Sequence, residues 1–299
     1  MNGHPMERYG HIMKLLRISG VLLFLLSAIS FAGYYGYATS RNDIVGPVIE
    51  FTGDEIAVGV EVTNEELLNN VTAYDEKDGD VTDTVLIEAV SDFIGPGQRM
   101  ITYAAFDSSG NVTKKERKLV YTDYKSPRFS LEKPLRFAIG DAANILRYMK
   151  VRDCIDGDLT ENIKFEEPDD FFGTAEDTYQ IKFQVTNSAG DTAVLPAEIE
   201  FYTPIYDSEK LIPEILLDEY LIYLKAGDTF KPEAHLKGVR INQEEYSIAQ
   251  LSQATISKES ISISTNVNTR KPGIYQAEYS ITAQNGNRGT TKLLIVVEE

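Results

Sequence analysis

The chain has little of several residue types on which common activities depend. One of its 299 residues is a cysteine, Cys154, so no disulfide can form within the chain. Beyond residue 40 the sole histidine is His235, so a Ser-His-Asp site would have one available base. No cluster has the spacing of zinc ligands, and no glycine-rich loop resembles a phosphate-binding loop. These absences predict a protein that is not an enzyme.

Positive charge is also scarce. The net charge is −17, and residues 1–40 hold three basic residues and one acidic residue, so the remainder carries −19. Such a surface repels nucleic acid and anionic lipid. It suits a soluble outer domain, either simply solvated or holding divalent cations. The chain has 17 tyrosines but no tryptophan, and exposed aromatic rings are what sugar-binding platforms favour.

One long uncharged stretch stands near the N-terminus. Residues 18–38 hold no charge, and 21 residues at about 1.5 Å each span about 30 Å of hydrocarbon. Lys14 and Arg17 precede the stretch, which predicts a cytoplasmic segment 1–17 and a transmembrane signal anchor 18–38, with the rest extracellular. The alternative is a cleaved signal peptide, because Ser30–Ala32 and Gly36–Ala38 both fit a small-x-small cleavage site. No cysteine lies near this segment, which excludes a lipoprotein anchor.

A strand-and-turn unit occurs three times after this segment, at Pro96–Asn111, Asp177–Gly190 and Pro272–Gly286. The second copy alternates strictly, with Tyr179, Ile181, Phe183 and Val185 on one face, and the third places Tyr275, Ala277, Tyr279 and Ile281 likewise. A sheet with one dry face needs a second sheet over it. The repeats predict three β-sandwich domains at 45–123, 124–203 and 211–299. The first linker is short, whereas Thr203–Ile212 is longer and should bend more.

An acidic motif precedes the first two of these units. Ala73–Thr82 and Val151–Thr160 each contain Asp-Gly-Asp followed by a threonine. The candidate calcium ligands are Asp75, Asp78, Asp80, Asp83 and Asp107 in the first repeat and Asp153, Asp156 and Asp158 in the second. The spacing is not that of an EF-hand loop. The alternative is a tight turn held by hydrogen bonds from side chain to backbone, completed by Thr82 and Thr160.

Together the two motifs resemble a known family. Pro-Gly-x-x-x-Ile-x-Tyr-x-Ala-x-Asp-x-x-Gly-Asn and the upstream Asp-Gly-Asp-Val-Thr are similar to the bacterial surface immunoglobulin-like repeats of pesticidal crystal toxins, which are related to hyalin-type repeats. The resemblance covers roughly 45–299, although the third repeat lacks Asp-Gly-Asp. It implies an all-β fold of three tandem immunoglobulin-like sandwiches.

The resemblance also implies a role by analogy. The expected function is adhesive or structural presentation on a bacterial surface, with an unknown surface protein or glycan as partner, the membrane contacted through 18–38, and no nucleic acid bound. Two alternatives remain at this point: binding of cell-wall or capsule carbohydrate, and a membrane-tethered sensor or assembly partner acting through the helix.

Overall fold

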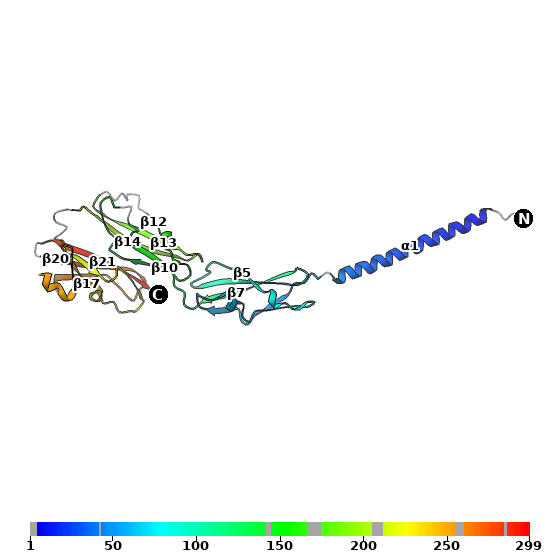
Figure 1. Ribbon diagram of the computed structural model, residues 1–299, viewed down its shortest axis with the longest axis horizontal. Coiled ribbons are helices and arrows are strands. Elements are labelled where there is room, and N and C mark those ends of the chain that lie inside the picture. The colour runs from blue at the N-terminus through cyan, green and yellow to red at the C-terminus, as the bar shows by residue number, and fades with distance from the viewer. Residues whose placement is uncertain are drawn as a thin grey trace. The chain divides into compact units, whose positions relative to one another are not determined.

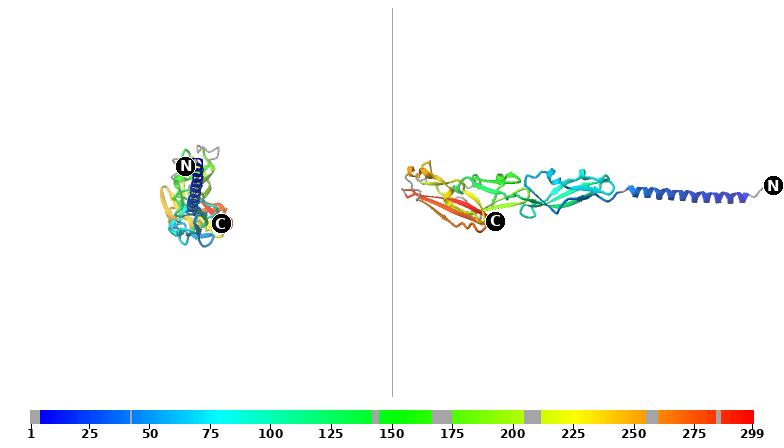
Figure 2. Two further views of the ribbon diagram at one scale, coloured as in Figure 1. Left: turned by 90° about the vertical axis from the view of Figure 1, so that its right-hand side faces the viewer. Right: turned by 90° about the horizontal axis from the view of Figure 1, so that it is seen from below.

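The computed structural model describes residues 5–41, 43–141, 145–166, 175–204, 212–254, 260–283 and 286–299. It begins with helix α1 (Pro5–Arg41), which runs without interruption (Figures 1 and 2). The segment Ile12–Tyr37 within α1 is long and apolar enough to cross a membrane, and none of its most apolar window is buried against protein. The predicted span 18–38 therefore lies entirely inside a helix.

The first sandwich pairs a three-stranded sheet with a four-stranded one. One sheet has the order β1 (Val48–Glu50), β3 (Thr72–Asp75), β4 (Gly79–Asp80), and the other β2 (Glu55–Val58), β7 (Val112–Tyr121), β6 (Gln98–Phe106), β5 (Leu86–Val90). The short helices are α2 (Asn64–Leu68) and the 3-10 turn η1 (Thr82–Thr84). Thr63 and Glu66 form the capping box that their spacing predicts at the start of α2.

The second and third sandwiches repeat this topology. The second has β11 (Gly157–Asp158), β10 (Met149–Asp153), β8 (Arg128–Leu131) facing β12 (Lys164–Glu166), β13 (Asp177–Thr186), β14 (Thr192–Tyr202), β9 (Arg136–Ala138), with η3 at Thr160–Asn162. The third has β15 (Glu214–Leu217), β17 (Leu236–Ile241), β18 (Glu244–Ser247) facing β16 (Leu221–Lys225), β21 (Arg288–Glu298), β20 (Gly273–Thr282), β19 (Ile261–Thr265), with η5 (Pro232–His235) and η6 (Ile248–Ala254). The prediction of three tandem immunoglobulin-like sandwiches after one apolar helix is confirmed.

The central hairpins follow the alternation read from the sequence. The inward side chains of β13 are buried, with Phe183 and Ile181 at 0% and 1% exposure, while the outward positions between them face solvent. The turns that follow the three long strands each contain a glycine with positive φ: Gly110, Gly190 and Gly286. A side chain with a Cβ rarely adopts that conformation, so these glycines let each hairpin turn.

By their internal contacts, the residues fall into two compact units. One comprises 1–56, 62–90 and 100–119, and the other comprises 57–61, 91–99 and 120–299. In the second unit the buried apolar residues of the second and third sandwiches form one continuous cluster, from Phe129 to Val297. The Phe129 amide also donates to the Tyr223 hydroxyl at 2.9 Å, and Lys292 pairs with Glu198 at 2.5 Å.

This packing bears on the predicted second linker, Thr203–Ile212. Residues 205–211 of that linker lie outside the described residues, and the second and third sandwiches are joined by a shared core rather than by the linker alone. The guanidinium of Arg128 lies 4.7 Å from the centre of the Tyr223 ring and pairs with Glu298. The physical reason lies in β21, whose Leu293–Val297 is apolar on both faces, so both faces need cover.

Candidate cation site

The acidic loop of the first sandwich is first of all a hydrogen-bonded turn. Asp75 ends β3, and its Oδ1 accepts from the amides of Lys77 and Asp78, both at 2.9 Å. Gly79 has φ +80°, which closes the turn into β4. The Asp80 carboxylate then accepts from the Thr82 amide at 3.0 Å. The carboxylates of Asp75 and Asp80 therefore accept hydrogen bonds from backbone amides, as the turn interpretation predicts.

Two further side chains tie this loop to its surroundings. The Thr82 hydroxyl accepts from the Ala73 amide at 3.0 Å. Asp78 accepts at both oxygens from Ser108, from the amide at 2.7 Å and from the hydroxyl at 2.8 Å. Asp78 thus joins the acidic loop to the turn between β6 and β7. Asp83 lies exposed in η1.

The second sandwich reproduces these bonds residue for residue. Asp153 accepts from the amides of Ile155 and Asp156 at 2.8 and 2.9 Å. Asp156 accepts from the amide and hydroxyl of Ser188, both at 2.6 Å. Asp158 accepts from the Thr160 amide at 3.0 Å, and the Thr160 hydroxyl accepts from the Val151 amide at 3.1 Å. The carboxylates of Asp78, Asp80, Asp156 and Asp158 are all engaged in turns.

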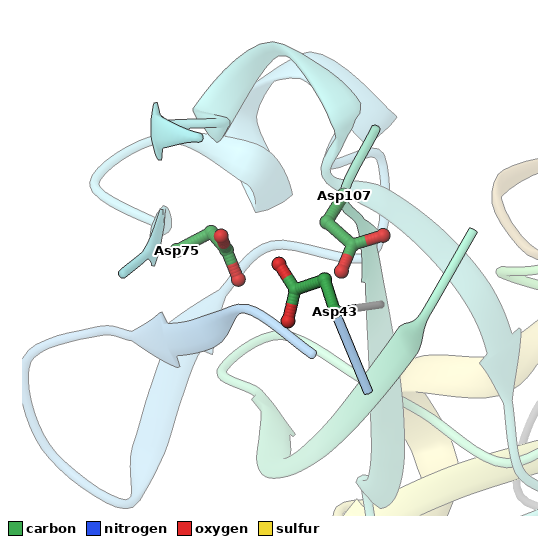
Figure 3. A group of neighbouring side chains, drawn as sticks. All are labelled: Asp43, Asp75 and Asp107. Carbon is green, nitrogen blue, oxygen red and sulfur yellow. The ribbon is translucent and has the colours of Figure 1, made fainter. Parts of the chain in front are cut away.

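Three carboxylates converge in the first sandwich alone among the described residues. Asp43, Asp75 and Asp107 each place an oxygen within 4.8 Å of the other two (Figure 3). Asp75 ends β3 and is 3% exposed, Asp107 follows β6 and is 8% exposed, and Asp43 lies two residues after α1. The sequence predicted Asp75 and Asp107 as ligands but not Asp43, because nothing in the linker pattern shows that the linker turns back onto the sandwich.

The three carboxylates are not equally satisfied. Asp107 accepts from the amide of Asn111 at 2.7 Å and from its Nδ2 at 2.6 Å. Burial acts to raise the pKa of Asp107, but the hydrogen bonds from Asn111 and from the amides of Ser109 and Gly110 bring that pKa below its ordinary value. Asp107 is therefore ionised at neutral pH.

Asp43 is the least satisfied of the three. Its Oδ1 accepts from the Val45 amide at 3.2 Å. Its Oδ2 is buried without a hydrogen-bond partner among the described residues, and the side chain keeps 11% of its accessible surface. The Lys77 ammonium lies 4.0 Å from Oδ2, at the outer limit of an ion pair. The linker itself is held, since Asn111 Nδ2 also donates to the carbonyl of Asp43 at 3.1 Å.

The donor set fits a hard divalent cation. Two oxygens that bind one calcium ion at about 2.4 Å lie at most about 4.8 Å apart, which is the bound within which the three carboxylate oxygens fall. The group contains no histidine or cysteine, so zinc or copper is a poor match. Three carboxylates supply part of a coordination shell of about six to eight oxygens, and water and carbonyl oxygens would supply the rest.

The corresponding place in the second sandwich is closed without a cation. Asn187 stands where the first sandwich has Asp107, and its Nδ2 donates to Asp153 Oδ2 at 3.2 Å. The linker residue Tyr124 donates its hydroxyl to Asp191 Oδ2 at 2.6 Å and accepts from Asn187 Nδ2 at 3.0 Å. Burial, together with the bond to Asp191, raises the pKa of Tyr124, so the hydroxyl stays protonated. Each polar group here has a partner.

Comparison with known proteins adds little beyond the fold. No family model matches the chain, and no curated protein matches it. Solved structures that are similar include the CBM51-2 domain with GlcNAc and INT domains of Clostridium perfringens ZmpB, at 15% identity and TM-score 0.21, covering 50% of this chain and 26% of that one. Drosophila N-cadherin EC1-4 is similar at 13% identity and TM-score 0.18, covering 76% and 63%. The lipoprotein BT2262 of Bacteroides thetaiotaomicron is similar at 12% identity and TM-score 0.19, covering 83% and 98%.

These likenesses have strict limits. The chain spans about a quarter to a half of the length of the first three structures. TM-scores near 0.2 carry no functional argument, and the resemblance to crystal-toxin-type repeats stays a prediction. The chain is a set of immunoglobulin-like sandwiches behind an apolar helix.

Proposed function

We propose that the protein is a single-pass surface protein of bacteria, with its N-terminus in the cytoplasm, whose sandwiches serve adhesive or structural presentation outside the membrane. One observation supports the anchor above all: Ile12–Tyr37 is long and apolar enough to cross a membrane, its residues from 18 onward carry no charge, and none of its most apolar window is buried in protein. A helix that is apolar on every side needs a nonpolar environment, and a bilayer provides it for a segment of this length.

The charges on either side support the orientation. Two basic residues, Lys14 and Arg17, lie at the N-terminal side of the uncharged stretch, whereas on the other side a single basic residue, Arg41, is followed by Asp43. Basic residues are retained on the cytoplasmic side of a membrane helix, which places the acidic sandwiches outside. The exposed tyrosines Tyr34, Tyr35 and Tyr37 stand where an aromatic belt meets the outer headgroups.

The sole cysteine makes this topology testable. Cys154 is free and exposed in the second sandwich, so a membrane-impermeant maleimide should label the full chain on intact cells. In the double variant Tyr9→Cys/Cys154→Ser, we expect labelling only after the cells are permeabilised, because residue 9 lies on the cytoplasmic side. Labelling of Tyr9→Cys on intact cells would reverse the orientation. Loss of residue 9 from the mature chain would show a cleaved signal peptide instead of an anchor.

The proposed role is binding or presentation rather than catalysis. Support comes from the shared core of the second and third sandwiches, which joins two modules into one compact unit with a continuous surface for presentation. Cells that express the full chain should be retained on protein-coated surfaces more than cells expressing α1 alone. Equal retention of the two would contradict adhesion, and loss of function on exchange of 18–38 for an unrelated anchor would favour a membrane-tethered sensor.

Carbohydrate binding remains the second candidate because of one cleft. A cavity of about 740 Å³ lies within the second unit, and its lining includes Tyr148, Tyr202, Arg136, Glu200 and Arg240. Tyrosine rings beside charged hydrogen-bonding groups are a combination that can hold a sugar. If this candidate is right, the full chain in detergent should be retained on cell-wall polysaccharide, and Tyr202→Ala should reduce that retention while Tyr74→Ala, on the exposed face of β3, should not. Equal retention of the two variants would contradict it.

A further inference from the structure

We infer that Asp43, Asp75 and Asp107 bind one calcium ion, and that this ion fastens the linker after α1 to the first sandwich. This goes beyond the proposed function, because it concerns how the sandwiches are attached rather than what they bind. The acidic loop alone would not support the inference, since two of its predicted ligands, Asp78 and Asp80, are engaged in turn hydrogen bonds that Asp156 and Asp158 repeat in the second sandwich.

The first support is the unsatisfied Asp43. Its Oδ2 has no solvent access and no hydrogen-bond partner among the described residues, and its side chain is about nine-tenths buried. Figure 3 shows this carboxylate directed to the space between Asp75 and Asp107. A buried carboxylate without a partner is costly, and a bound cation is the usual compensation when other carboxylates face it.

The second support is the balance of charge. Three carboxylates meet, and the Lys77 ammonium lies at the edge of ion-pair range of Asp43. Asn111 donates two hydrogen bonds to the Asp107 carboxylate, at 2.7 and 2.6 Å, and so holds it in place within the cluster. A divalent ion neutralises most of this charge, and carboxylate oxygens are the donors that calcium prefers.

The third support is a comparison of the first sandwich with the second. At the same place in the second sandwich, the acid and the amide exchange positions, so that Asn187 and Asp191 replace Asp107 and Asn111. The Tyr124 hydroxyl then fills the centre with hydrogen bonds to both. In the second sandwich this place holds a protonated hydroxyl and an amide, which satisfy each other by hydrogen bonds. In the first sandwich the same place holds three carboxylate oxygens, which need a cation to compensate their charge.

The consequence is a calcium-dependent linker. Asp43 is the second residue after α1, so an ion that holds Asp43 also orders the chain between the helix and β1. Without the ion, repulsion among the three carboxylates favours release of the linker. Extracellular calcium modules bind their ion at about 0.1 to 1 mM, so the attachment would be ordered outside a cell and released by a chelator.

The test uses the full chain in detergent micelles, melted in EDTA and in about 10 mM CaCl2. Calcium should raise the melting temperature of the first sandwich by roughly 5 °C, with one ion bound per chain in a calorimetric titration. Hydrogen–deuterium exchange of residues 43–50 should slow on adding calcium. The same titration with MgCl2 should give a smaller shift, because magnesium needs closer octahedral oxygens.

The decisive variant is Asp43→Asn, matched with Asp83→Asn. Both remove one acidic charge from the first sandwich, but Asp83 is exposed and outside the cluster. Asp43→Asn should abolish the calcium shift and, in EDTA, melt higher than the natural chain because the repulsion is reduced. Asp83→Asn should keep the shift. An unchanged melt of the natural chain in calcium, or the same shift in Asp43→Asn, would overturn the inference.

Discussion

The first and second sandwiches build the same acidic loop and hairpin but close them in different ways. In both, an aspartate ends the strand β3 or β10 and accepts two backbone amides, and a second aspartate holds the serine of the hairpin turn. In the first, the centre then holds Asp107 and Asp43, while in the second it holds Asn187 and Tyr124. One arrangement accumulates charge, and the other pairs each donor with an acceptor.

The difference shows that the Asp-Gly-Asp motif does not itself determine a cation site. The motif supplies the turn in both sandwiches, and its own aspartates are largely satisfied by backbone amides. The two sandwiches differ in the order of acid and amide at the hairpin turn, which is Asp107 then Asn111 in the first and Asn187 then Asp191 in the second. They differ also in the residue that the preceding linker contributes. The site therefore depends on three segments far apart in the sequence.

The largest effect is expected when the second sandwich is given the acid of the first. Asn187 is 5% exposed and its Nδ2 has two acceptors, so Asn187→Asp removes both donations and buries a charge beside Asp153 and Asp191. We expect a loss of roughly 3 kcal/mol in the stability of the second sandwich, read from hydrogen exchange of residues 153–160. The control Asn162→Asp, exposed in η3, should change little. Equal effects of the two would show that the buried amide is not what closes this site.

The fold could be predicted largely from the sequence. Period-two alternation identified the long strands, and the Asn- and Gly-rich turns identified the hairpins, because both signals are local. The packing of the second sandwich on the third was missed, although Leu293–Val297 is apolar on both faces. Alternation shows which face of a strand is dry inside one sandwich, and says nothing about which neighbour covers the other face.

The site could be predicted only in part. Asp75 and Asp107 stand within motifs and were identified, whereas Asp43 stands in a linker without a pattern. Its contact with Asp107 spans 64 positions and exists because Asn111 binds the carbonyls of Asp43 and Val45. Such a contact arises from the closure of the whole sandwich, so the sequence gives no local sign of it.

A smaller effect is expected from removing the hydroxyl that closes the second sandwich. Tyr124→Phe leaves the ring beside Phe93, at 4.5 Å between centres, but removes the donation to Asp191 and the acceptor for Asn187. Hydrogen bonds to charged groups contribute about 2 kcal/mol, so we expect a loss of that size in urea unfolding. Calcium should not restore it. Tyr74→Phe, on an exposed tyrosine, serves as the control, and calcium rescue of Tyr124→Phe would contradict the division between the two sites.

The features that the two sandwiches share should respond alike. Thr82→Val removes a hydroxyl that accepts a hydrogen bond from the Ala73 amide at 3.0 Å, and Thr160→Val removes one that accepts from the Val151 amide at 3.1 Å. We expect about 1 kcal/mol of destabilisation in each sandwich, measured by exchange of the strands β3 and β10. A much larger effect in the first sandwich, with calcium present, would show that Thr82 also supports the cation.

The smallest expected effect is on the loss of stability at low pH. Hydrogen bonds from the side chain and amide of Thr160 hold the pKa of Asp158 below its ordinary value, and Thr82 does the same for Asp80. Because both folded-state pKa values lie below the unfolded value of about 3.9, each carboxylate stabilises the fold above about pH 4. That contribution is lost as the pH falls through the folded-state pKa. Melting from pH 5 to pH 2 in EDTA should therefore be less steep for Asp158→Asn than for the natural chain. Asp80→Asn should flatten the acid loss of the first sandwich in the same way, because Thr82 holds the pKa of Asp80 below its ordinary value, and an unchanged curve in either variant would contradict this prediction.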